Sequence, residues 1–213
     1  MAPDAPVLIE TMRLRAGEVP LLELHRHRLL ASCRILDIPS PSLTLPKGGP
    51  DRVVRAEVSV DGVTISERPL GSVRPVSLVW SRVVHEPYRH KTLEREQFDR
   101  TLEAAREAGA DDGLLLTKQG HVAEAAIWSL YWWDGATLCA PPLGLGILPA
   151  VSRARIDQLA GPVVERRVTR GDLEGKSLIV SNAARGLVPV SLLEGKPVPE
   201  HPETARLQEA FWP

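Results

Sequence analysis

The sequence lacks several features that mark particular classes of protein. Its two cysteines, Cys33 and Cys139, lie far apart and outside any Cys-x-x-Cys or histidine-rich pattern. We therefore expect buried free thiols rather than a metal site or a disulfide. No apolar run approaches the roughly 20 residues of a membrane span, and no basic segment followed by an apolar one indicates a secretory signal. These absences predict a cytoplasmic protein without a bound metal.

An excess of either charge is also missing. The 213 residues include 26 Lys and Arg against 27 Asp and Glu, which gives a net charge of −1. A balanced chain gives no electrostatic indication of nucleic acid or of an acidic membrane as a partner. The motifs G-x-G-x-x-G and G-x-x-x-x-G-K-[ST] do not occur either, so neither a dinucleotide site nor a P-loop is predicted.

Lysine is scarce, because only five of the 26 cationic residues are lysines. Four of them (Lys47, Lys118, Lys176 and Lys196) stand beside Gly or Gln in turn-like stretches. Lys91 alone lies next to a histidine and near an aromatic residue, in "YRHKTLER", just ahead of a helical pattern. A lone lysine before a helix is usually a solvated charge, so a functional role for Lys91 depends on what the rest of the chain provides.

The hydrophobic spacing indicates strands and helices mixed without a βαβ rhythm, which is typical of an α+β fold. Asp61-Gly62 separates two strand-like runs and is the strongest hairpin signal in the chain. We place a boundary between a small N-terminal α/β domain (1–82) and a larger strand-rich domain (83–213). The spacing predicts strands at 7–14 and 73–81, helices at 21–37, 93–108 and 150–160, and short strands elsewhere in the larger domain.

Three other stretches could act together with Lys91. Glu124 interrupts the apolar run "GHVAEAAIWSLYW", where an acid is costly unless a cation or a protonated nitrogen pairs with it. "LGILPAVSRARI" enters a helix whose small first turn leaves N–H groups free to bind phosphate. In "VSNAARGLVPV", small residues let another backbone approach closely. A reactive amine, a carboxylate and backbone anion sites are the groups that pyridoxal 5'-phosphate (PLP) requires.

Together these stretches resemble the fold-type-IV PLP enzymes, which include branched-chain and D-amino-acid aminotransferases and aminodeoxychorismate lyases. The resemblance runs from about Leu8 to Pro189 and includes an H-x-x-R-L motif at His25, Arg28 and Leu29. Its other segments are "HKTLER", "GHVAEAAIWSLYW", "PPLGLGILPAVSR" and "SNAARGLVPV", in the order of the family. The resemblance implies a two-part α+β fold with a strand-rich pseudo-barrel domain, PLP as cofactor, a small-molecule amine or amino acid as substrate, and a homodimer.

The resemblance also implies roles for single residues. Lys91 takes the place of the catalytic lysine that binds the cofactor covalently, and Glu124 that of the acid at the pyridine nitrogen. The substrate carboxylates need cationic partners, for which Arg185 and Arg55 are candidates because guanidinium groups bind carboxylates in pairs of hydrogen bonds. The cofactor-binding residues expected on this basis are Arg28, Lys91, Glu124, Val151, Ser152, Asn182 and Ala183.

Within the family, "SNAARGLVPV" resembles the N-[AS]-x-x-G-x-x-P-V pattern of aminodeoxychorismate lyases. Aminotransferases more often carry a Gly-Thr or Thr-Thr pair followed by an acid there. The favoured function is therefore a PLP-dependent lyase of folate biosynthesis that converts 4-amino-4-deoxychorismate to 4-aminobenzoate and pyruvate. A branched-chain or D-amino-acid aminotransferase is the alternative. A non-catalytic relative of the fold is disfavoured, because Lys91, Glu124 and Arg28 are all present.

Overall fold

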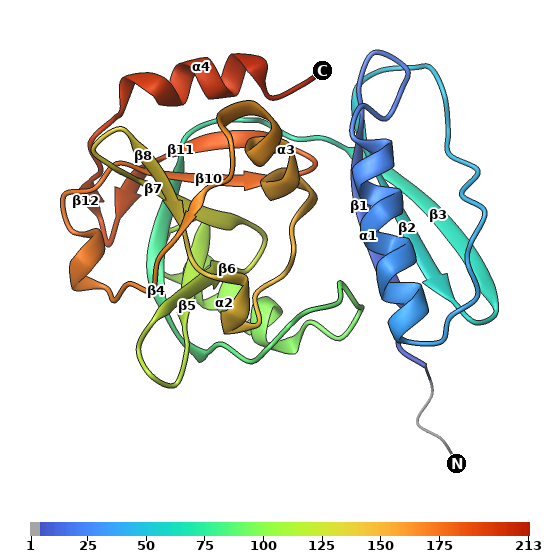
Figure 1. Cartoon of the computed structure of the whole chain (residues 1–213), viewed down its shortest axis with the longest axis horizontal. Helices are drawn as coiled ribbons and strands as arrows, with labels where there is room; N and C mark the ends of the chain where they lie inside the picture. Colours follow the sequence, from blue (N-terminus) through green and yellow to red (C-terminus); the bar gives the residue numbers. More distant parts are fainter. Residues whose placement is uncertain (1–4) are drawn as a thin grey trace.

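The computed structural model describes residues 5–213 and consists of two parts that lie side by side (Figure 1). The small part contains β1 (Leu8–Leu14), α1 (Leu22–Ile35), β2 (Arg52–Ser59) and β3 (Gly62–Pro69). Its strands form an antiparallel sheet in the order β1-β2-β3. Leu29 and Cys33 of α1 pack against Leu8 and Val58 of this sheet and form its core on that face.

The hairpin predicted at Asp61-Gly62 is confirmed, with a shift of one residue in the turn. Ser59 pairs with Gly62, so Val60 and Asp61 form the two-residue loop. Gly62 has a φ of 140°, a backbone conformation that glycine adopts far more readily than other residues.

The large part contains most of the strands. These elements are β4 (Val76–Val84), α2 (Glu96–Glu107), β5 (Asp112–Leu116), β6 (Val122–Ala125), β7 (Ser129–Asp134), β8 (Thr137–Ala140), η1 (Leu143–Leu145), α3 (Val151–Ala160), β9 (Val164–Glu165), η2 (Gly171–Leu173), β10 (Leu178–Asn182), β11 (Gly186–Leu193), β12 (Lys196–Pro197) and α4 (Pro202–Ala210). The strands form one sheet in the order β6-β5-β4-β11-β10-β7-β8-β9, and β12 pairs with β11.

This sheet curls back on itself. β6 is the first strand in its order and β7 the sixth, yet a short turn at 126–128 joins them, with the N–H of Ala125 donating to the carbonyl oxygen of Trp128 at 3.0 Å. Strands that are five places apart in the order are thus brought together around a core that includes Leu114, Leu130 and Val180. The curled, strand-rich domain of an α+β fold is what the resemblance implied.

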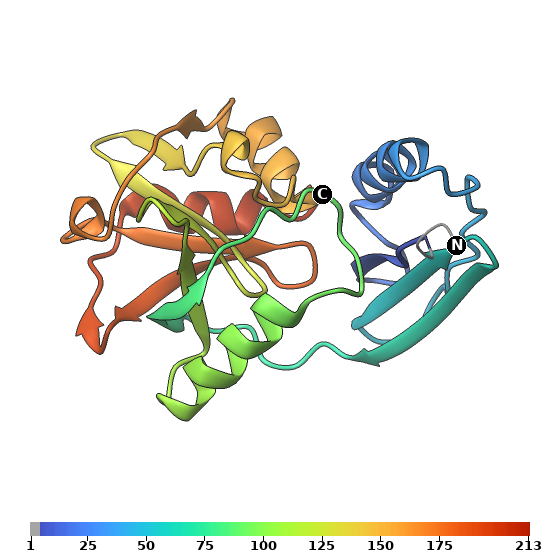
Figure 2. The same ribbon diagram turned by 90° about the horizontal axis from the view of Figure 1, so that it is seen from below.

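Two segments of chain cross between the parts (Figure 2). Residues 70–75 lead from β3 into β4, and residues 85–95 lead from β4 past the small part to α2. In the second segment the N–H of Ile9 donates to the carbonyl oxygen of Lys91 at 2.7 Å, and the N–H of Leu93 donates to that of Val7 at 2.9 Å. The segment around Lys91 is therefore attached to β1 by backbone hydrogen bonds.

The strand β4 bears on where the two parts divide. The predicted division between residues 82 and 83 falls inside β4, which pairs with β5 and β11 of the large sheet. We propose that the division lies in the connecting segment 70–75 instead. The predicted helices at 21–37, 93–108 and 150–160 correspond to α1, α2 and α3, each with slightly shorter bounds.

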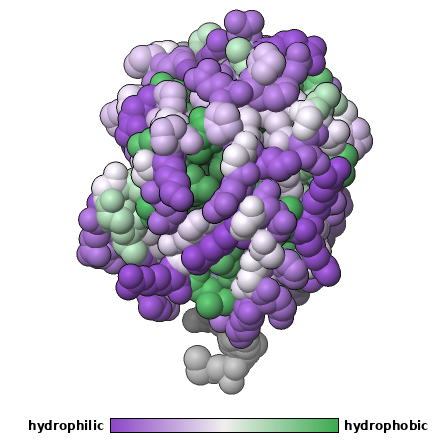
Figure 3. Space-filling view, turned by 90° about the vertical axis from the view of Figure 1, so that its left-hand side faces the viewer, coloured by the Kyte–Doolittle hydropathy of each residue, from purple (hydrophilic) through white to green (hydrophobic). Residues whose placement is uncertain are grey.

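The cysteines and the helices bear on what the sequence was expected to lack. Cys33 and Cys139 are both buried and free in the described chain, as expected. Within residues 5–213, no helix has the length and apolar composition to cross a membrane. Figure 3 views the end of the large part that faces away from the small part, where hydrophilic side chains predominate.

Candidate active site

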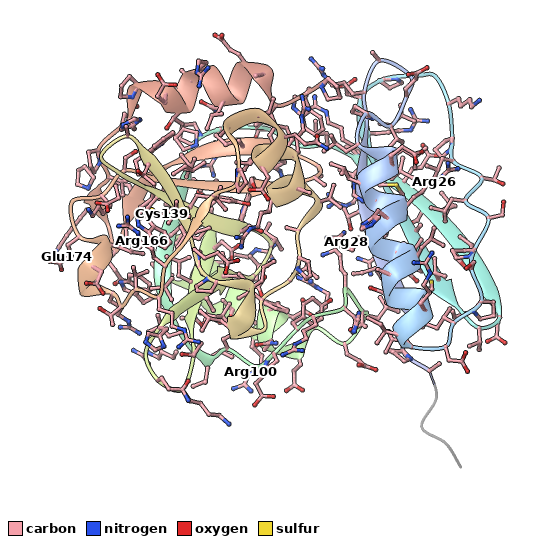
Figure 4. The ribbon with its side chains drawn as sticks, viewed as in Figure 1. Arg26, Arg28, Arg100, Cys139, Arg166 and Glu174 are labelled. Carbon is pink, nitrogen blue, oxygen red and sulfur yellow. The ribbon has the colours of Figure 1, made fainter. Side chains whose placement is uncertain are left out.

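A cavity of about 250 Å³ brings the predicted site residues together. This volume is close to the roughly 300 Å³ at which small-molecule sites begin. Arg28 projects from the side of α1 that faces the large part, whereas Arg26 lies on the opposite side (Figure 4). All of the residues predicted from the sequence line the cavity: Arg28, Arg55, Lys91, Glu124, Val151, Ser152, Asn182, Ala183 and Arg185.

The segment before α2 fixes the position of Lys91. The hydroxyl of Tyr88 donates to the carbonyl oxygen of Thr92 and accepts from its N–H, both at 2.7 Å. The ring of Tyr88 packs edge-on against Phe98 of α2, with 4.8 Å between the ring centroids. The carbonyl group of Lys91 is also hydrogen-bonded to β1, so the backbone is restrained both at Lys91 and at Thr92. The side chain of Lys91 lines the cavity.

The amine of Lys91 lies in an environment that disfavours its charge. Burial and the positive charges of Arg28 and Arg95 lower the pKa of Lys91 to about 7, although Glu10 and Glu124 act in the opposite direction. A large fraction of the amine is therefore neutral near pH 7. A neutral lysine amine is a nucleophile and a base, which a protonated one is not.

Glu124 lies on β6 and is 6% exposed. Its Oε1 accepts from the N–H of Leu148 at 3.2 Å and lies 3.1 Å from Nε2 of His85. The acid that interrupts this apolar strand thus contacts a histidine and a backbone amide. The carboxylate is held at the wall of the cavity rather than in the apolar core.

The turn after Glu124 forms another wall, and Asp112 holds it. The carboxylate of Asp112 accepts from the N–H groups of Gly113, Ala126 and Ile127 at 2.7, 3.1 and 3.0 Å. Burial raises the pKa of Asp112 to about 6, although these hydrogen bonds lower it. Arg95 completes the support, because its Nη2 donates to the carbonyl oxygen of Ala126 at 2.8 Å.

On the other side of the cavity, Glu10 holds Arg28 in place. The Nε and Nη2 groups of Arg28 donate to Oε1 and Oε2 of Glu10 at 2.9 and 2.5 Å. His25 lies 2.6 Å from Oε2 of Glu10. Burial opposes the charge of Glu10, but the charge of Arg28 and the hydrogen bonds lower the pKa of Glu10 to about 2. Arg28 also reaches across the two parts, where its Nη1 donates to the carbonyl oxygen of Pro149 at 3.4 Å.

The N-terminus of α3 faces the same cavity. The helix begins at Val151, after Ala150 in an extended conformation, and no side chain caps it. Its first N–H groups therefore remain available to an anion. The hydroxyl of Ser152 accepts from that of Ser181 at 2.8 Å, which joins this helix end to β10.

The turn between β10 and β11 is shaped by Asn182. Its Oδ1 accepts from the N–H groups of Ala184 and Arg185 at 3.1 and 2.8 Å. The side chain of Asn182 thus holds the turn, which brings the backbone of Ala183 and the side chain of Arg185 to the cavity.

Besides Arg28 and Arg95, three further arginines line the cavity from different elements. Arg55 on β2 pairs with Glu57 at 2.9 Å. Arg68 on β3 and Arg185 form no ion pair with an acid among residues 5–213. Burial and the charge of Arg68 lower the pKa of Arg185, so the two guanidinium groups repel each other. An anion between them would relieve that repulsion.

Among the residues that hold or extend this site and that the sequence analysis missed are Glu10, Arg68, His85 and Arg95. Glu10 carried a usable signal, because it is an acid within the apolar strand "VLIETMRL", like Glu124 within its own strand. The other three are ordinary polar residues of the sequence, and only the tertiary structure brings them to the cavity or to Glu124.

Comparison with known proteins agrees with this arrangement. A sequence profile of the family described as amino-transferase class IV matches residues 7–193, most of the chain. The chain belongs to this family. Among curated proteins, the aminodeoxychorismate lyase of Bacillus subtilis (strain 168) is 29% identical over 110 residues. Those residues are 48% of this chain but only 38% of that protein.

Solved structures of class IV enzymes share the fold. A branched-chain aminotransferase from Thermoproteus uzoniensis, with norvaline, superimposes with a TM-score of 0.84 at 21% identity, covering 97% of this chain and 84% of that one. A protein of Legionella pneumophila provisionally named 4-amino-4-deoxychorismate lyase gives a TM-score of 0.83 at 21% identity, covering 97% and 92%. At these identities the likeness establishes the α+β fold, and it does not distinguish a lyase from an aminotransferase.

The family uses PLP, and a hypothetical aminotransferase from Mycobacterium tuberculosis (TM-score 0.83, 19% identity, covering 99% of this chain and 88% of that one) has it bound. The cavity fits this cofactor. Lys91 supplies an amine of lowered pKa, and Glu124 supplies a buried carboxylate. Arg28 and the uncapped end of α3 supply positive charge and free N–H groups for a phosphate. The chain thus belongs to a family of PLP-dependent enzymes, and its cavity offers the groups that this cofactor requires.

Proposed function

We propose that this protein is a lyase that converts 4-amino-4-deoxychorismate to 4-aminobenzoate and pyruvate. The observation that carries the proposal is the pair of arginines, Arg68 and Arg185, that line the cavity of Lys91 without an acidic partner in the described chain. The substrate bears two carboxylates, and each can accept two hydrogen bonds from one guanidinium group. Arg55 is a weaker candidate than at the sequence level, because Glu57 already pairs with it.

The other residues take roles that follow from their positions. Arg28 and the N–H groups of Val151 and Ser152 would hold the cofactor phosphate, with the backbone of Ala183 beside them. Glu124 would supply the negative charge for the pyridine nitrogen. When bound, PLP supplies an electron-accepting ring joined to the substrate amine.

Lys91 is the group that moves protons. Its neutral amine takes the proton from the substrate carbon that bears the nitrogen. The bond to the enolpyruvyl oxygen then breaks, and the enolpyruvate gains a proton at carbon to become pyruvate. One proton is removed and one is added, so the two products account for all atoms of the substrate without water or a second substrate. Formation of an aromatic ring drives the reaction.

The test is incubation of the PLP-loaded protein with 4-amino-4-deoxychorismate and no keto acid. We expect 4-aminobenzoate and pyruvate in equal amounts. Substitution Arg185→Ala should raise KM more than it lowers kcat, because a carboxylate contact acts in the ground state and the transition state alike. Arg74→Ala is a matched control, since Arg74 pairs with the surface residue Asp111 and does not line the cavity. An unchanged KM for Arg185→Ala would contradict the proposed substrate contact.

A branched-chain or D-amino-acid aminotransferase is the second candidate. The apolar side chains of Ile9, Ile127 and Leu148 line the same cavity and could accept an aliphatic substrate side chain. Steady transfer of an amino group to 2-oxoglutarate from an L- or D-amino acid, without release of 4-aminobenzoate from the other substrate, would favour it. In both cases borohydride reduction should fix PLP on the peptide that contains Lys91, and labelling at Lys118 or Lys176 instead would contradict both.

A homodimer remains a prediction from the family resemblance, and we propose it as the functional form. Sedimentation of the purified protein tests it directly. A monomer that is fully active would show that one chain completes the site.

A further inference from the structure

The carboxylate of Glu124 has two hydrogen-bond donors, the backbone N–H of Leu148 and the imidazole of His85. The N–H of Leu148 lies 3.2 Å from Oε1 and 3.4 Å from Oε2, so it favours Oε1 only slightly. The Nε2 atom of His85 lies 3.1 Å from Oε1. Both donors thus lie nearer to Oε1 than to Oε2 or contact Oε1 alone. Oε2 therefore keeps most of its capacity to accept a hydrogen bond in the cavity.

His85 follows directly after β4 and is itself fixed. It is 4% exposed, and its backbone N–H donates to the carbonyl oxygen of Leu116 at 2.8 Å. The imidazole does not line the cavity of Lys91. It lines a second hollow of about 530 Å³, which His121, Lys118 and Arg167 also border. His85 therefore stands between this outer hollow and the carboxylate of Glu124, and it does not itself line the cavity of Lys91.

The chemistry of the pair decides which atom carries the proton. A carboxylate only accepts hydrogen bonds, and a neutral imidazole donates from one nitrogen. An anionic Glu124 therefore requires the proton of His85 on Nε2. The opposite arrangement, with a bare Nε2, would need a protonated Glu124, which could not stabilise a protonated pyridine nitrogen.

We propose that His85 is a positioning residue that holds Glu124 as an anion with Oε2 turned to the cofactor ring. The inference deepens the proposed function and rests on its PLP-binding part, and it is independent of which substrate the enzyme uses. Removal of such a supporting partner loosens the orientation of the group that touches the cofactor, as it does for the outer partners of metal ligands.

The test compares His85→Leu with His85→Gln, because the glutamine amide can place a donor near the position of Nε2. The first readout is the Kd of the protein for PLP. The second is the ¹⁵N chemical shift of the ring nitrogen in ¹⁵N-labelled PLP, which reports whether that nitrogen is protonated. We expect His85→Leu to raise Kd about tenfold, the loss typical of one hydrogen bond to a charged group, and to move the shift toward the neutral form.

His85→Gln should bring both readouts most of the way back to the wild type. His121→Leu is the matched control, since His121 borders the same hollow without contacting Glu124, and it should change neither readout. Circular dichroism shows whether each variant is folded. A wild-type shift and Kd in His85→Leu, or a glutamine variant as impaired as the leucine variant, would overturn the inference.

The experiment also separates this inference from the choice of reaction. A protein that binds PLP, responds to His85→Leu as expected and releases no 4-aminobenzoate would keep the role of His85 and lose the lyase assignment. A lyase whose cofactor is unaffected by His85→Leu would keep its function and lose the positioning role.

Discussion

At the scale of single residues, the central feature is an amine placed among cations. Arg28 and Arg95 lie close enough to Lys91 to lower its pKa, and burial adds to their effect. Glu10 neutralises part of the charge of Arg28, which moderates this effect. The result is a lysine whose pKa of about 7 suits the nucleophile and base that we propose it to be near neutral pH.

The pKa of Lys91 predicts the pH dependence of its reactivity. In the cofactor-free protein, acylation of Lys91 by a small anhydride should reach half of its maximal rate near pH 7, because only the neutral amine reacts. Competitive labelling from pH 6 to 9, followed by peptide mass spectrometry, measures this rate for each lysine. The exposed residues Lys47 and Lys118 are internal controls. A profile for Lys91 that parallels theirs would show that its environment is not as described.

Part of this site could be predicted from sequence, and the reason differs between residues. Lys91, Glu124 and Arg28 belong to short motifs, so the resemblance identified them. Arg68 and His85 could not be identified, because their roles depend on where β3 ends relative to the β10–β11 turn and on how His85, just after β4, reaches Glu124 on β6. A motif specifies the groups that meet a ligand, whereas the groups that support them depend on packing.

At the scale of elements, the N-terminus of α3 is positioned to bind an anion through its backbone. Ala150 precedes the helix with φ −73° and ψ 138°, and no side chain occupies the first N–H groups. A proline fits the first helical position, since its missing N–H has no partner within the helix, and the residue before it favours an extended conformation. Val151 can therefore be replaced by proline to remove a single N–H.

Val151→Pro should weaken PLP binding without unfolding the helix. We expect its Kd for PLP to be about tenfold higher than that of Val151→Ala, in line with one lost hydrogen bond to a charged group. The alanine variant is the proper reference, because both substitutions shorten a buried side chain but only one removes the N–H. Fluorescence titration gives Kd, and thermal melting checks the fold. Equal affinities would show that phosphate is bound elsewhere.

The segment between β4 and α2 is a second element on which the site depends. Tyr88 satisfies both backbone groups of Thr92, which is 8% exposed, so removal of its hydroxyl leaves a buried donor and acceptor unpaired. We expect Tyr88→Phe to lower the free energy of unfolding by about 2 kcal/mol, measured in urea. Tyr131→Phe should cost less, because that hydroxyl meets Ser181 at the longer distance of 3.3 Å. Equal losses would argue against a special role for this segment.

The elements themselves were only partly predictable. Helical spacing located α1, α2 and α3, because each has an apolar face that repeats over several turns. α4 was not predicted, although Pro202 at its start and Glu203 in its first turn are helix-start signals. β4 was assigned mostly to the small part, because its pairing with β5 and β11 involves residues far away in sequence. The spacing of residues within one segment does not predict such pairing.

At the scale of the whole molecule, residues of the site help to hold the two parts together. β1 binds the backbone at Lys91, and Arg28 joins α1 to Pro149 of the large part. The cationic groups that both parts place around one amine also lower the free energy of unfolding of the cofactor-free protein. A charged Lys91 must coexist with Arg28 and Arg95 in a poorly solvated cavity.

This cost predicts a pH dependence of stability in the cofactor-free protein. The pKa of Lys91 is about 7 when folded, against about 10.4 for an unfolded lysine. Between these two values, Lys91 binds more protons in the unfolded chain than in the folded one. The free energy of unfolding of the cofactor-free protein therefore rises with pH through Lys91, and this increase is lost as the pH falls toward 7. The gain is at most about 1.4 kcal/mol per pH unit.

Lys91→Met isolates this contribution, because other titrating groups are shared with the wild type. In urea unfolding of the cofactor-free proteins, the variant should exceed the wild type in stability by the largest margin at pH 7, and the margin should shrink as pH rises to 9. The exposed Lys118→Met is the control and should keep a constant difference from the wild type over the same range. Parallel curves for Lys91→Met and the wild type would mean that the folded protein leaves the pKa of Lys91 unchanged, and the combination of burial with two nearby arginines could then no longer explain a reactive amine.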